Sequence, residues 1–329
     1  MTGTPPLVAE TLDNDLLSQL LSSVRLTGSV FLDGQFRAPF GVISPARWEE
    51  TPGFSRLRHA SVFHLVTDGG CTMRIHTGGA FELSEGDLVL LPFTAEHQFW
   101  SGEHSGFVFG PDIARDGPVP GVNVIDHGGS GPMTRLVCGF IESAELLPSP
   151  LFRTLPDVII EPTRNAAGPV AATAQAVQAV LRDSPGPGSP AILGRLMEVL
   201  FVEVVRRHAS RLPPDARGIL AACRDPVVSR AIASLHAEPS RHWTIEDLAA
   251  DAGASRTVLG ERFAKLLGAA PIEYLARLRM QLAAERLRST RQSLIQVAEA
   301  VGYESEAAFS RAFRRIVGVS PGAWREAAA

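Results

Sequence analysis

The spacing of the hydrophobic positions changes along the chain and separates two kinds of structure. Between Gly28 and about Ile141 these positions form short β-prone runs, at residues 61–66, 71–75 and 87–91, with Gly and Asp pairs between them. Short strands punctuated by turn residues are typical of an antiparallel sandwich or barrel. Ahead of them, residues 11–25 carry an apolar side chain at every fourth position, which predicts an amphipathic helix.

Helical spacing replaces the strand signals after Pro148. Residues 171–181 and 191–208 are predicted helices, and the Pro- and Gly-rich segment 183–190 between them suits neither a helix nor a strand. The second of these helices has a Leu and Val face, which serves either core packing or a dimer interface. Pro213 and Pro214 mark a linker, and the chain reads as helical after Asp225. The pattern predicts an α+β protein with an all-α last part.

The last hundred residues contain a repeat. A closing Phe, Gly and Pro recur 50 residues apart: Phe263, Gly268 and Pro271, then Phe313, Gly318 and Pro321. The opening glycines, Gly253 and Gly302, lie 49 residues apart, so the second turn holds one residue more. Each unit predicts a helix-turn-helix, because Gly adopts the positive φ of the turn and a Ser (Ser255 or Ser305) caps the helix that follows.

The second helix of each unit has a predicted buried face and a predicted outer face. We expect these side chains to be buried: Val258, Leu259, Phe263 and Leu266, and Ala308, Phe309, Phe313 and Ile316. The outer faces carry the candidates for contact with base edges: Arg256, Thr257, Gly260 and Glu261, and Glu306, Ala307, Ser310 and Arg311. The candidates for phosphate contact are Lys265, Arg314 and Arg315. A helix over residues 271–289 would hold both units rigidly, about one DNA turn or roughly 34 Å apart.

Charge supports this placement. The net charge of −4 argues against a protein that coats nucleic acid along its whole length, but residues 220–329 carry 15 basic and 12 acidic side chains, whereas residues 1–219 carry 16 and 23. The sequence shows no apolar run of membrane-spanning length and no secretory signal, and three cysteines suit a reducing compartment. We therefore expect a cytoplasmic protein without a membrane partner.

The repeat region resembles the C-terminal domain of AraC-type (AraC/XylS) transcriptional regulators over about residues 225–326. The motifs that carry the likeness are ARLRMQLAA at 276–284, the segments 297–305 and 309–313, and SPGAWR at 320–325. Gly260 and Glu261 depart from the longer polar or basic side chains common in the family. The resemblance implies a bacterial regulator, not an enzyme, that binds duplex DNA as activator or repressor, with a homodimer and RNA polymerase as further candidate partners.

The first part resembles the cupin sensor half of the same regulators over about residues 10–160, through the segments 63–66, 83–92 and 95–97. This resemblance implies a small jelly-roll barrel. The predicted organisation is a cupin-like sensor at 1–160, a helical connector and possible dimerisation element at 161–215, and a double helix-turn-helix domain at 216–329.

Four side chains of the first part are candidates for a site: His64, Cys71, His97 and Cys138. If they converge, a mixed His and Cys set would suit zinc or another soft divalent ion, or a thiol redox sensor. The alternative is that they pack in the barrel core. The two histidines and one glutamate of a cupin enzyme are not present, and Ser61 stands where an acidic ligand is expected.

Three functions follow from these patterns. The first is a transcription factor whose barrel senses a small molecule, a metal or a redox signal. The second is a cupin metalloenzyme with a helical appendage, which would need a complete metal triad. The third is an adaptor that binds peptides through its helical part.

Overall fold

The computed structural model describes residues 15–23, 26–45, 60–76, 78–93, 95–103, 106–143, 151, 154–162, 168–183 and 185–328. The chain forms two compact units. The sheet unit comprises residues 25–144 and 155–210, and the helical unit comprises residues 1–24, 145–154 and 211–329. No helix among the described residues is long and apolar enough to cross a membrane.

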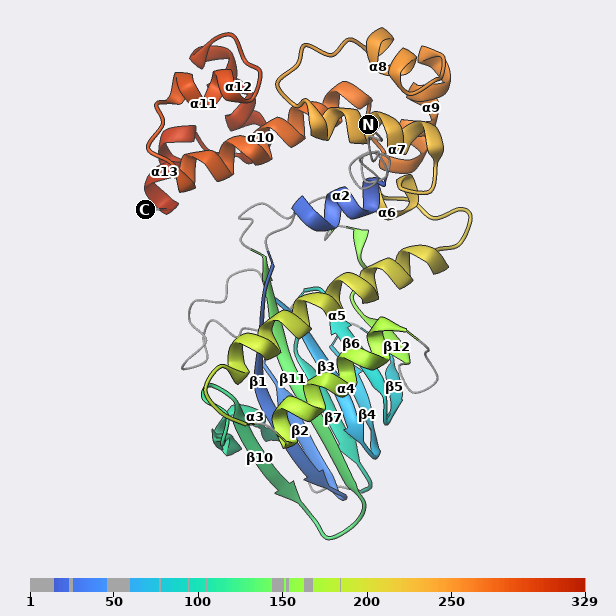
Figure 1. Cartoon of the computed structure of the whole chain (residues 1–329), viewed down its shortest axis with the longest axis vertical. Coiled ribbons are helices and arrows are strands. Elements are labelled where there is room, and N and C mark those ends of the chain that lie inside the picture. Colours follow the sequence, from blue (N-terminus) through green and yellow to red (C-terminus); the bar gives the residue numbers. More distant parts are fainter. Residues whose placement is uncertain are drawn as a thin grey trace, which may run out of the picture. The chain divides into compact units, whose positions relative to one another are not determined.

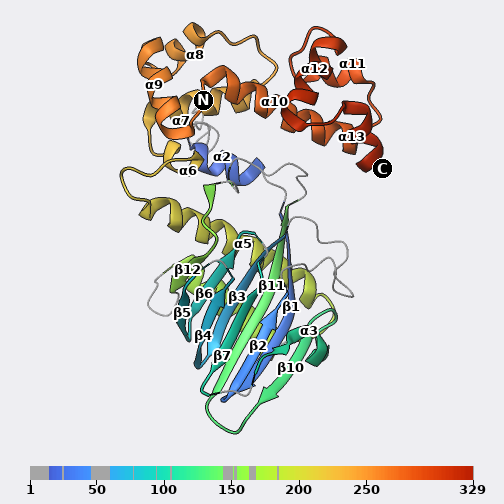
Figure 2. The same ribbon diagram turned by 180° about the vertical axis from the view of Figure 1, so that it is seen from behind.

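The sheet unit consists of two facing sheets and the helices that cover one of them (Figures 1 and 2). Its strands are β1 (Leu26–Arg37), β2 (Phe40–Ser44), β3 (Ala60–Asp68), β4 (Gly70–Ile75), β5 (Ala80–Ser84), β6 (Asp87–Leu91), β7 (His97–Ser101), β8 (Val108–Phe109), β9 (Arg115–Asp116), β10 (Asn123–Gly128), β11 (Met133–Ser143) and β12 (Ile159–Pro162). The 7-stranded sheet has the order β12-β6-β3-β11-β1-β10-β9, and the 5-stranded sheet has the order β5-β4-β7-β2-β8. All strand pairs are antiparallel except β1 with β10 and β2 with β8.

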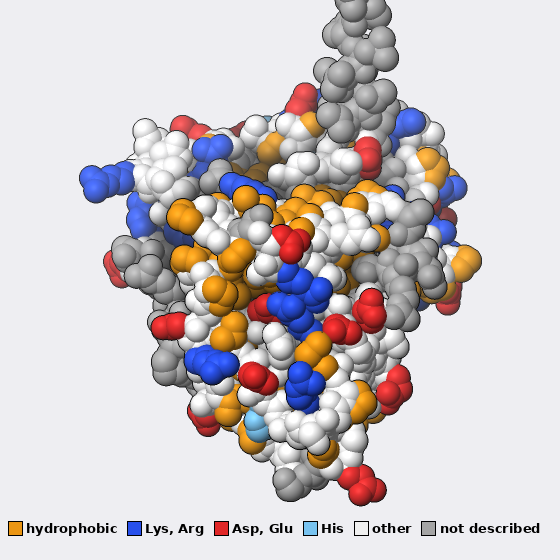
Figure 3. Space-filling model, turned by 60° about the horizontal axis from the view of Figure 1, so that its bottom comes forward, with side chains coloured by type: hydrophobic (Ala, Val, Ile, Leu, Met, Phe, Trp, Pro, Cys, Tyr) orange, Lys and Arg blue, Asp and Glu red, His pale blue; other side chains and the backbone are white. Residues whose placement is uncertain are grey.

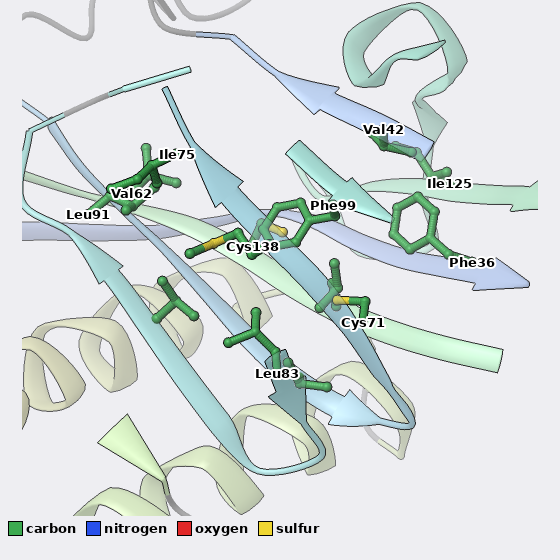
Figure 4. Packing of buried hydrophobic residues seen from close by; sticks show 14 of the residues in the cluster. Phe36, Val42, Val62, Cys71, Ile75, Leu83, Leu91, Phe99, Ile125 and Cys138 are labelled. Carbon is green, nitrogen blue, oxygen red and sulfur yellow. The ribbon is translucent and has the colours of Figure 1, made fainter. Parts of the chain in front are cut away.

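Alternate side chains of the strands fill the space between the two sheets. Val62 and Val66 of β3 belong to this core with Phe99 of β7, as the close-up in Figure 4 shows for Val62 and Phe99. The intervening residues of β3 face the other way, because successive side chains of a strand point to opposite faces. The prediction of a sheet-rich, cupin-like first part is confirmed.

Two helices, α4 (Pro169–Arg182) and α5 (Ser189–Arg211), lie on the outer face of the 7-stranded sheet (Figures 1 and 2). Apolar side chains meet across a small cavity there: Phe63, Leu88, Leu90 and Ile141 of the sheet, and Met197, Leu200, Phe201 and Val204 of α5. The absence of a side chain at Gly28 of β1 allows α5 to approach the sheet closely, since a Cβ at that position would lie 2.2 Å from the carbonyl oxygen of Gly194. A short helix, α3 (Gly110–Ile113), lies at the edge of the 5-stranded sheet.

The helical unit contains α2 (Leu16–Ser23), α6 (Ile219–Ala222), α7 (Pro226–Ala237), α8 (Ile245–Asp251), α9 (Arg256–Leu267), α10 (Pro271–Ser289), α11 (Leu294–Ala300), α12 (Glu306–Val317) and α13 (Pro321–Ala328). The prediction of an all-α last part is confirmed. Helix α2 lies within the expected helix at 11–25, of which residues 11–14, 24 and 25 are outside the described residues. The boundaries expected at residues 160 and 215 stay predictions.

Candidate nucleic-acid interface

The first helix-turn-helix consists of α8 and α9. Thr244 begins α8 in a capping box: its hydroxyl accepts from the Asp247 N–H, and the Asp247 carboxylate accepts from the Thr244 N–H. The turn passes through Gly253 at φ +69°, where a side chain would be strained. Ser255 then caps α9 by accepting a hydrogen bond from the Val258 N–H at 3.3 Å.

The second helix-turn-helix, α11 and α12, repeats each of these features. Ser293 and Gln296 form the capping box of α11, and Ser305 caps α12 by accepting from the Ala308 N–H at 3.3 Å. Gly302 supplies the turn at φ +83°. Five residues separate α11 from α12 and four separate α8 from α9, as the unequal glycine spacing predicts.

The outer faces of α9 and α12 are open. Phe263 and Phe313 are fully buried under their helices. The side chains predicted to meet DNA lie at exposed or half-buried positions: Arg256, Thr257, Gly260, Glu261 and Lys265 on α9, and Glu306, Ala307, Ser310, Arg311, Arg314 and Arg315 on α12. Both helices therefore present a surface that a groove of DNA could receive.

Val258 corrects the predicted buried face of α9. The helical spacing predicts a core position for this side chain, but 37% of it is exposed. Leu259, the next residue, is the one that is fully buried. Val258 follows Thr257 on the first turn, where a branched apolar side chain can contact a thymine methyl group. Leu266, Ala308 and Ile316, also expected to be buried, are half-buried.

The basic side chains of the two helices differ in their partners. Arg256 forms an ion pair with Glu246 of α8 at 2.9 Å, and this hydrogen bond lowers the pKa of the exposed Glu246 carboxyl. Arg262 pairs with Asp225 at 3.2 Å. By contrast, Arg311, Arg314 and Arg315 of α12 pair with no acidic side chain of the described residues. Figure 3 shows instead the end of the sheet unit that lies at the bottom of Figure 1, where acidic and basic side chains are interspersed.

Helix α10 connects the two helix-turn-helix units within the helical unit, and it has the bounds that the sequence predicts. Tyr274, Leu275, Leu278 and Leu287 are buried, and Leu282 is half-buried. At its far end, the indole N–H of Trp324 donates to the carbonyl of Ala284 at 3.2 Å. Helices α11, α12 and α13 pack on this end of α10 around Phe309 and Phe313.

The sheet unit brings together part of the predicted His and Cys set. His64 Nδ1 lies 2.8 Å from Cys138 Sγ, at the directly paired positions of β3 and β11. His97 of the facing sheet lies next to them, with the two imidazole centroids 4.7 Å apart. The His97 Nδ1–H donates to the carbonyl of Ala95 at 2.7 Å, while Nε2 of both histidines has no hydrogen-bond partner among the described residues.

Burial favours the neutral forms of these groups. Burial lowers the pKa of His97 to about 4 and that of His64 well below its usual value. Burial raises the pKa of Cys71 to about 12 and that of Cys138 well above its usual value. Cys71 and Cys138 belong to the apolar core between the sheets, and Figure 4 shows Cys138 beside Phe99.

The expected metal site stays a prediction, and the structure brings together only part of its ligand set. Across the described ranges, no three His, Cys, Asp or Glu side chains are placed to hold one ion. The histidines themselves do not exclude an ion, because a metal-binding His commonly donates its other ring N–H to a backbone carbonyl, as His97 does. What the described residues lack is a third ligand placed with them. A thiolate-based redox site is disfavoured as well, because the reactive form of Cys is the thiolate, which the raised pKa values make scarce.

Comparison with known proteins matches both units. A cupin family matches residues 15–210, and a helix-turn-helix domain family matches residues 248–327. A Streptomyces lividans protein named as an AraC-like transcription regulator is 34% identical over 272 residues, which cover 80% of this chain and 86% of that protein. The HTH-type transcriptional regulator AlkR of Acinetobacter baylyi is 28% identical over 330 residues, with 95% and 99% covered.

A solved structure was also matched. The C-terminal domain of AraT, a response regulator from Geobacillus stearothermophilus, is 35% identical with a TM-score of 0.31, and the match covers 31% of this chain and 86% of that one. The cupin match contains α4 and all of α5 except Arg211, and the helix-turn-helix match contains both α9 and α12.

Proposed function

The chain belongs to the AraC-like transcription regulators, and we propose that it acts by placing α9 and α12 in successive major grooves on one face of duplex DNA. One observation carries the proposal: two helices with the same cap, the same closing glycine and the same buried Phe leave their outer faces open. The relatives are named as regulators, which favours this function over a cupin enzyme.

The exposed side chains divide into two roles. Arg311 has a free guanidinium on the outer face and is placed to donate two hydrogen bonds to a guanine edge. Arg256 can do the same after it exchanges Glu246 for a base or a phosphate. Lys265, Arg314 and Arg315, which lie farther along their helices, would fix the protein on the phosphates.

Salt dependence tests the phosphate contacts. The full chain is first used to select a duplex from a random pool, and its affinity for that duplex is measured over a range of salt concentrations. Alanine at Lys265, Arg314 or Arg315 should each reduce the slope of log K against log salt by about 1. Arg195→Ala, a matched loss of charge on α5, should leave the slope unchanged. An unchanged slope in all three variants, or equal affinity for unselected duplexes, would overturn the proposed interface.

We infer that the sheet unit is the sensing half. The support is the buried polar cluster, because a buried imidazole nitrogen without a partner costs stability and a bound ligand would satisfy it. A panel of small molecules, Zn²⁺ and peroxide can be screened by the melting temperature of the full chain. A true effector should shift the melting temperature of the parent and not that of His64→Ala or His97→Ala. An effector that stabilises both variants equally would remove these histidines from sensing.

A second copy of the chain is the partner that α5 supports. Ile192 and Val199 are 52% and 47% exposed and lie seven residues apart, so they share one face of the helix. Glu in place of Val199 should convert a dimer to a monomer in sedimentation equilibrium, whereas a monomeric parent protein would contradict this part. Contact with RNA polymerase in a bacterial cytoplasm completes the proposal.

A further inference from the structure

One arginine bridges the two helix-turn-helix units without belonging to either outer face. Arg279 lies in the middle of α10, and its guanidinium donates to three backbone carbonyls: Pro239 at 2.7 Å, Arg241 at 2.9 Å and Gly302 at 3.1 Å. Pro239 and Arg241 lie in the segment that leads into α8, whereas Gly302 is the turn glycine between α11 and α12. The contact therefore joins the entry of the first unit to the turn of the second.

The surroundings of Arg279 show that this junction is closely packed. A Cβ at Gly302 would lie 2.5 Å from the carbonyl oxygen of Ser240 and 2.7 Å from Nη2 of Arg279. The guanidinium also lies 5.7 Å from the centre of the Tyr303 ring, a cation–π contact. Beside it, His242 and Glu304 approach to 3.5 Å across the same junction. The turn at Gly302 and the segment that leads into α8 are therefore in contact through backbone atoms as well as side chains.

We propose that Arg279 is a positioning residue that locks α9 and α12 at one spacing and thereby sets the number of base pairs between the two half-sites of the operator. The inference rests on the proposed function. Helix α10 joins the units at its two ends, and the Arg279 junction adds a second connection that opposes bending and twisting between them. Two linked DNA-binding units raise the overall affinity only when the distance between them matches the distance between their half-sites. A rigid pair should therefore be intolerant of altered spacing.

The test measures affinity against spacing. The full chain and its variants are titrated with the selected duplex, with duplexes carrying one or two base pairs more or fewer between the half-sites, and with a duplex in which one half-site is scrambled. The parent protein should lose roughly 10-fold or more with each change of spacing. Arg279→Ala should bind the selected duplex roughly 10-fold more weakly, lose less than about 3-fold on changed spacing, and bind the scrambled duplex as the parent does.

Arg277→Ala is the matched control, since Arg277 lies two residues away on α10 and, within the described part of the chain, pairs only with Glu273 of the same helix, at 2.6 Å. It should keep the spacing dependence of the parent. Arg279→Lys should restore part of that dependence, because an ammonium can still donate to carbonyls but lacks the planar fork. Gly302→Ala disturbs the junction from the other side and should also relax the spacing dependence, which keeps the test open if Arg279→Ala fails to fold.

Two results would overturn the proposal. One is an undiminished spacing penalty in a folded Arg279→Ala or Gly302→Ala protein. The other is an equal loss of affinity for the selected and the scrambled duplex, which would assign Arg279 to DNA contact or to folding of one unit. A parent protein that selects no duplex would instead contradict the proposed function.

Discussion

The two helix-turn-helix units are alike in their cores and opposite on their outer faces. Under α9, the rings of Phe263 and Tyr274 meet edge to face at 5.8 Å, and under α12, Phe313 and Trp324 meet in the same way at 6.2 Å. Each pair is separated from its counterpart by 50 residues. The repeat therefore preserves the packing that places each recognition helix.

The outer faces differ in the sign of their charges at matched positions. Arg256 corresponds to Glu306, and Glu261 corresponds to Arg311, so each unit has a cation where the other has an anion. Bases that accept hydrogen bonds from Arg are unlike those that donate to Glu. If the proposed interface holds, two such faces should bind unlike half-sites rather than one sequence repeated.

The largest effects should come from the shared core. Phe263→Ala and Phe313→Ala each remove a fully buried ring and should each cost about 3–5 kcal/mol of stability. If the cores are equivalent, the two losses should be equal, and each should be confined to its own unit. Hydrogen exchange of the amides of α9 and α12 in the full chain measures both. A loss that differs by more than about 2 kcal/mol between the two variants would contradict the equivalence.

A titrating group should separate the two cores. Beside the first helix-turn-helix, Nε2 of His236 on α7 lies 2.8 Å from the hydroxyl of Tyr274, whose ring packs on Phe263 of α9, and burial lowers the pKa of His236 to about 4. In the second unit, the corresponding Trp324 donates instead to a backbone carbonyl, which does not titrate. The unfolded chain takes up a proton on His236 below about pH 6.5 that the folded chain accepts only near pH 4. The stability of the first unit is therefore complete above pH 6.5 and falls as the pH drops towards 4.

Between pH 6.5 and pH 4, the free energy of unfolding of this region should fall by at most about 1.4 kcal/mol per pH unit. Protection factors of α9 and α12 measured between pH 7 and pH 4.5 would show it as a loss confined to α9. His236→Gln should abolish this pH dependence of protection. His242→Gln, which replaces an exposed histidine in the segment before α8, should leave it unchanged. Equal losses of protection in both helices would assign the acid sensitivity to another part of the chain.

Matched positions on the outer faces should differ in their effect on DNA binding. Arg311→Ala should weaken binding to the selected duplex by about 1–3 kcal/mol if it reads a base. Glu261→Ala, at the equivalent position of α9, should change affinity by less than about 0.5 kcal/mol or increase it, because a carboxylate near phosphates is unfavourable unless it accepts from a cytosine. An Arg311→Ala protein with unchanged affinity would remove this residue from the interface.

Much of the helical unit follows from the sequence because its signals are local. Ser255 and Ser305 cap the predicted helices, and Gly253 and Gly302 have the positive φ that their place in the turns requires. The period of 50 residues then shows which side chains occupy matched positions. Helix caps, turns and a repeat can be recognised from the sequence without knowing the tertiary contacts.

The features that the sequence did not reveal depend on contacts between distant segments. Val258 carries an apolar side chain at a helical spacing that suits the core, and only the path of α9 shows that Leu259 takes that place. Arg279 is one of many arginines in the sequence, and its three carbonyl partners come from segments more than 20 residues away on either side. Likewise, pattern alone could not show that His64 meets Cys138 by its Nδ1 edge, or that no third ligand joins His64 and His97 among the described residues.

Gly260 offers the smallest but most selective test of the two outer faces. It lies within α9, where Gly weakens a helix, and a Cβ there would have no heavy atom within 4 Å apart from its own helix and neighbours. Its counterpart in α12 is Ser310, so the repeat itself does not need a glycine. Gly260→Ala should raise stability by about 0.5–1 kcal/mol and at the same time weaken DNA binding, if the glycine is there to let a DNA backbone or base edge approach. Urea unfolding and duplex titration of one variant measure both changes, with Ser310→Ala as the matched control. If Gly260→Ala gains stability and binds DNA as the parent does, α9 lies farther from the duplex than α12, and the second unit carries more of the reading.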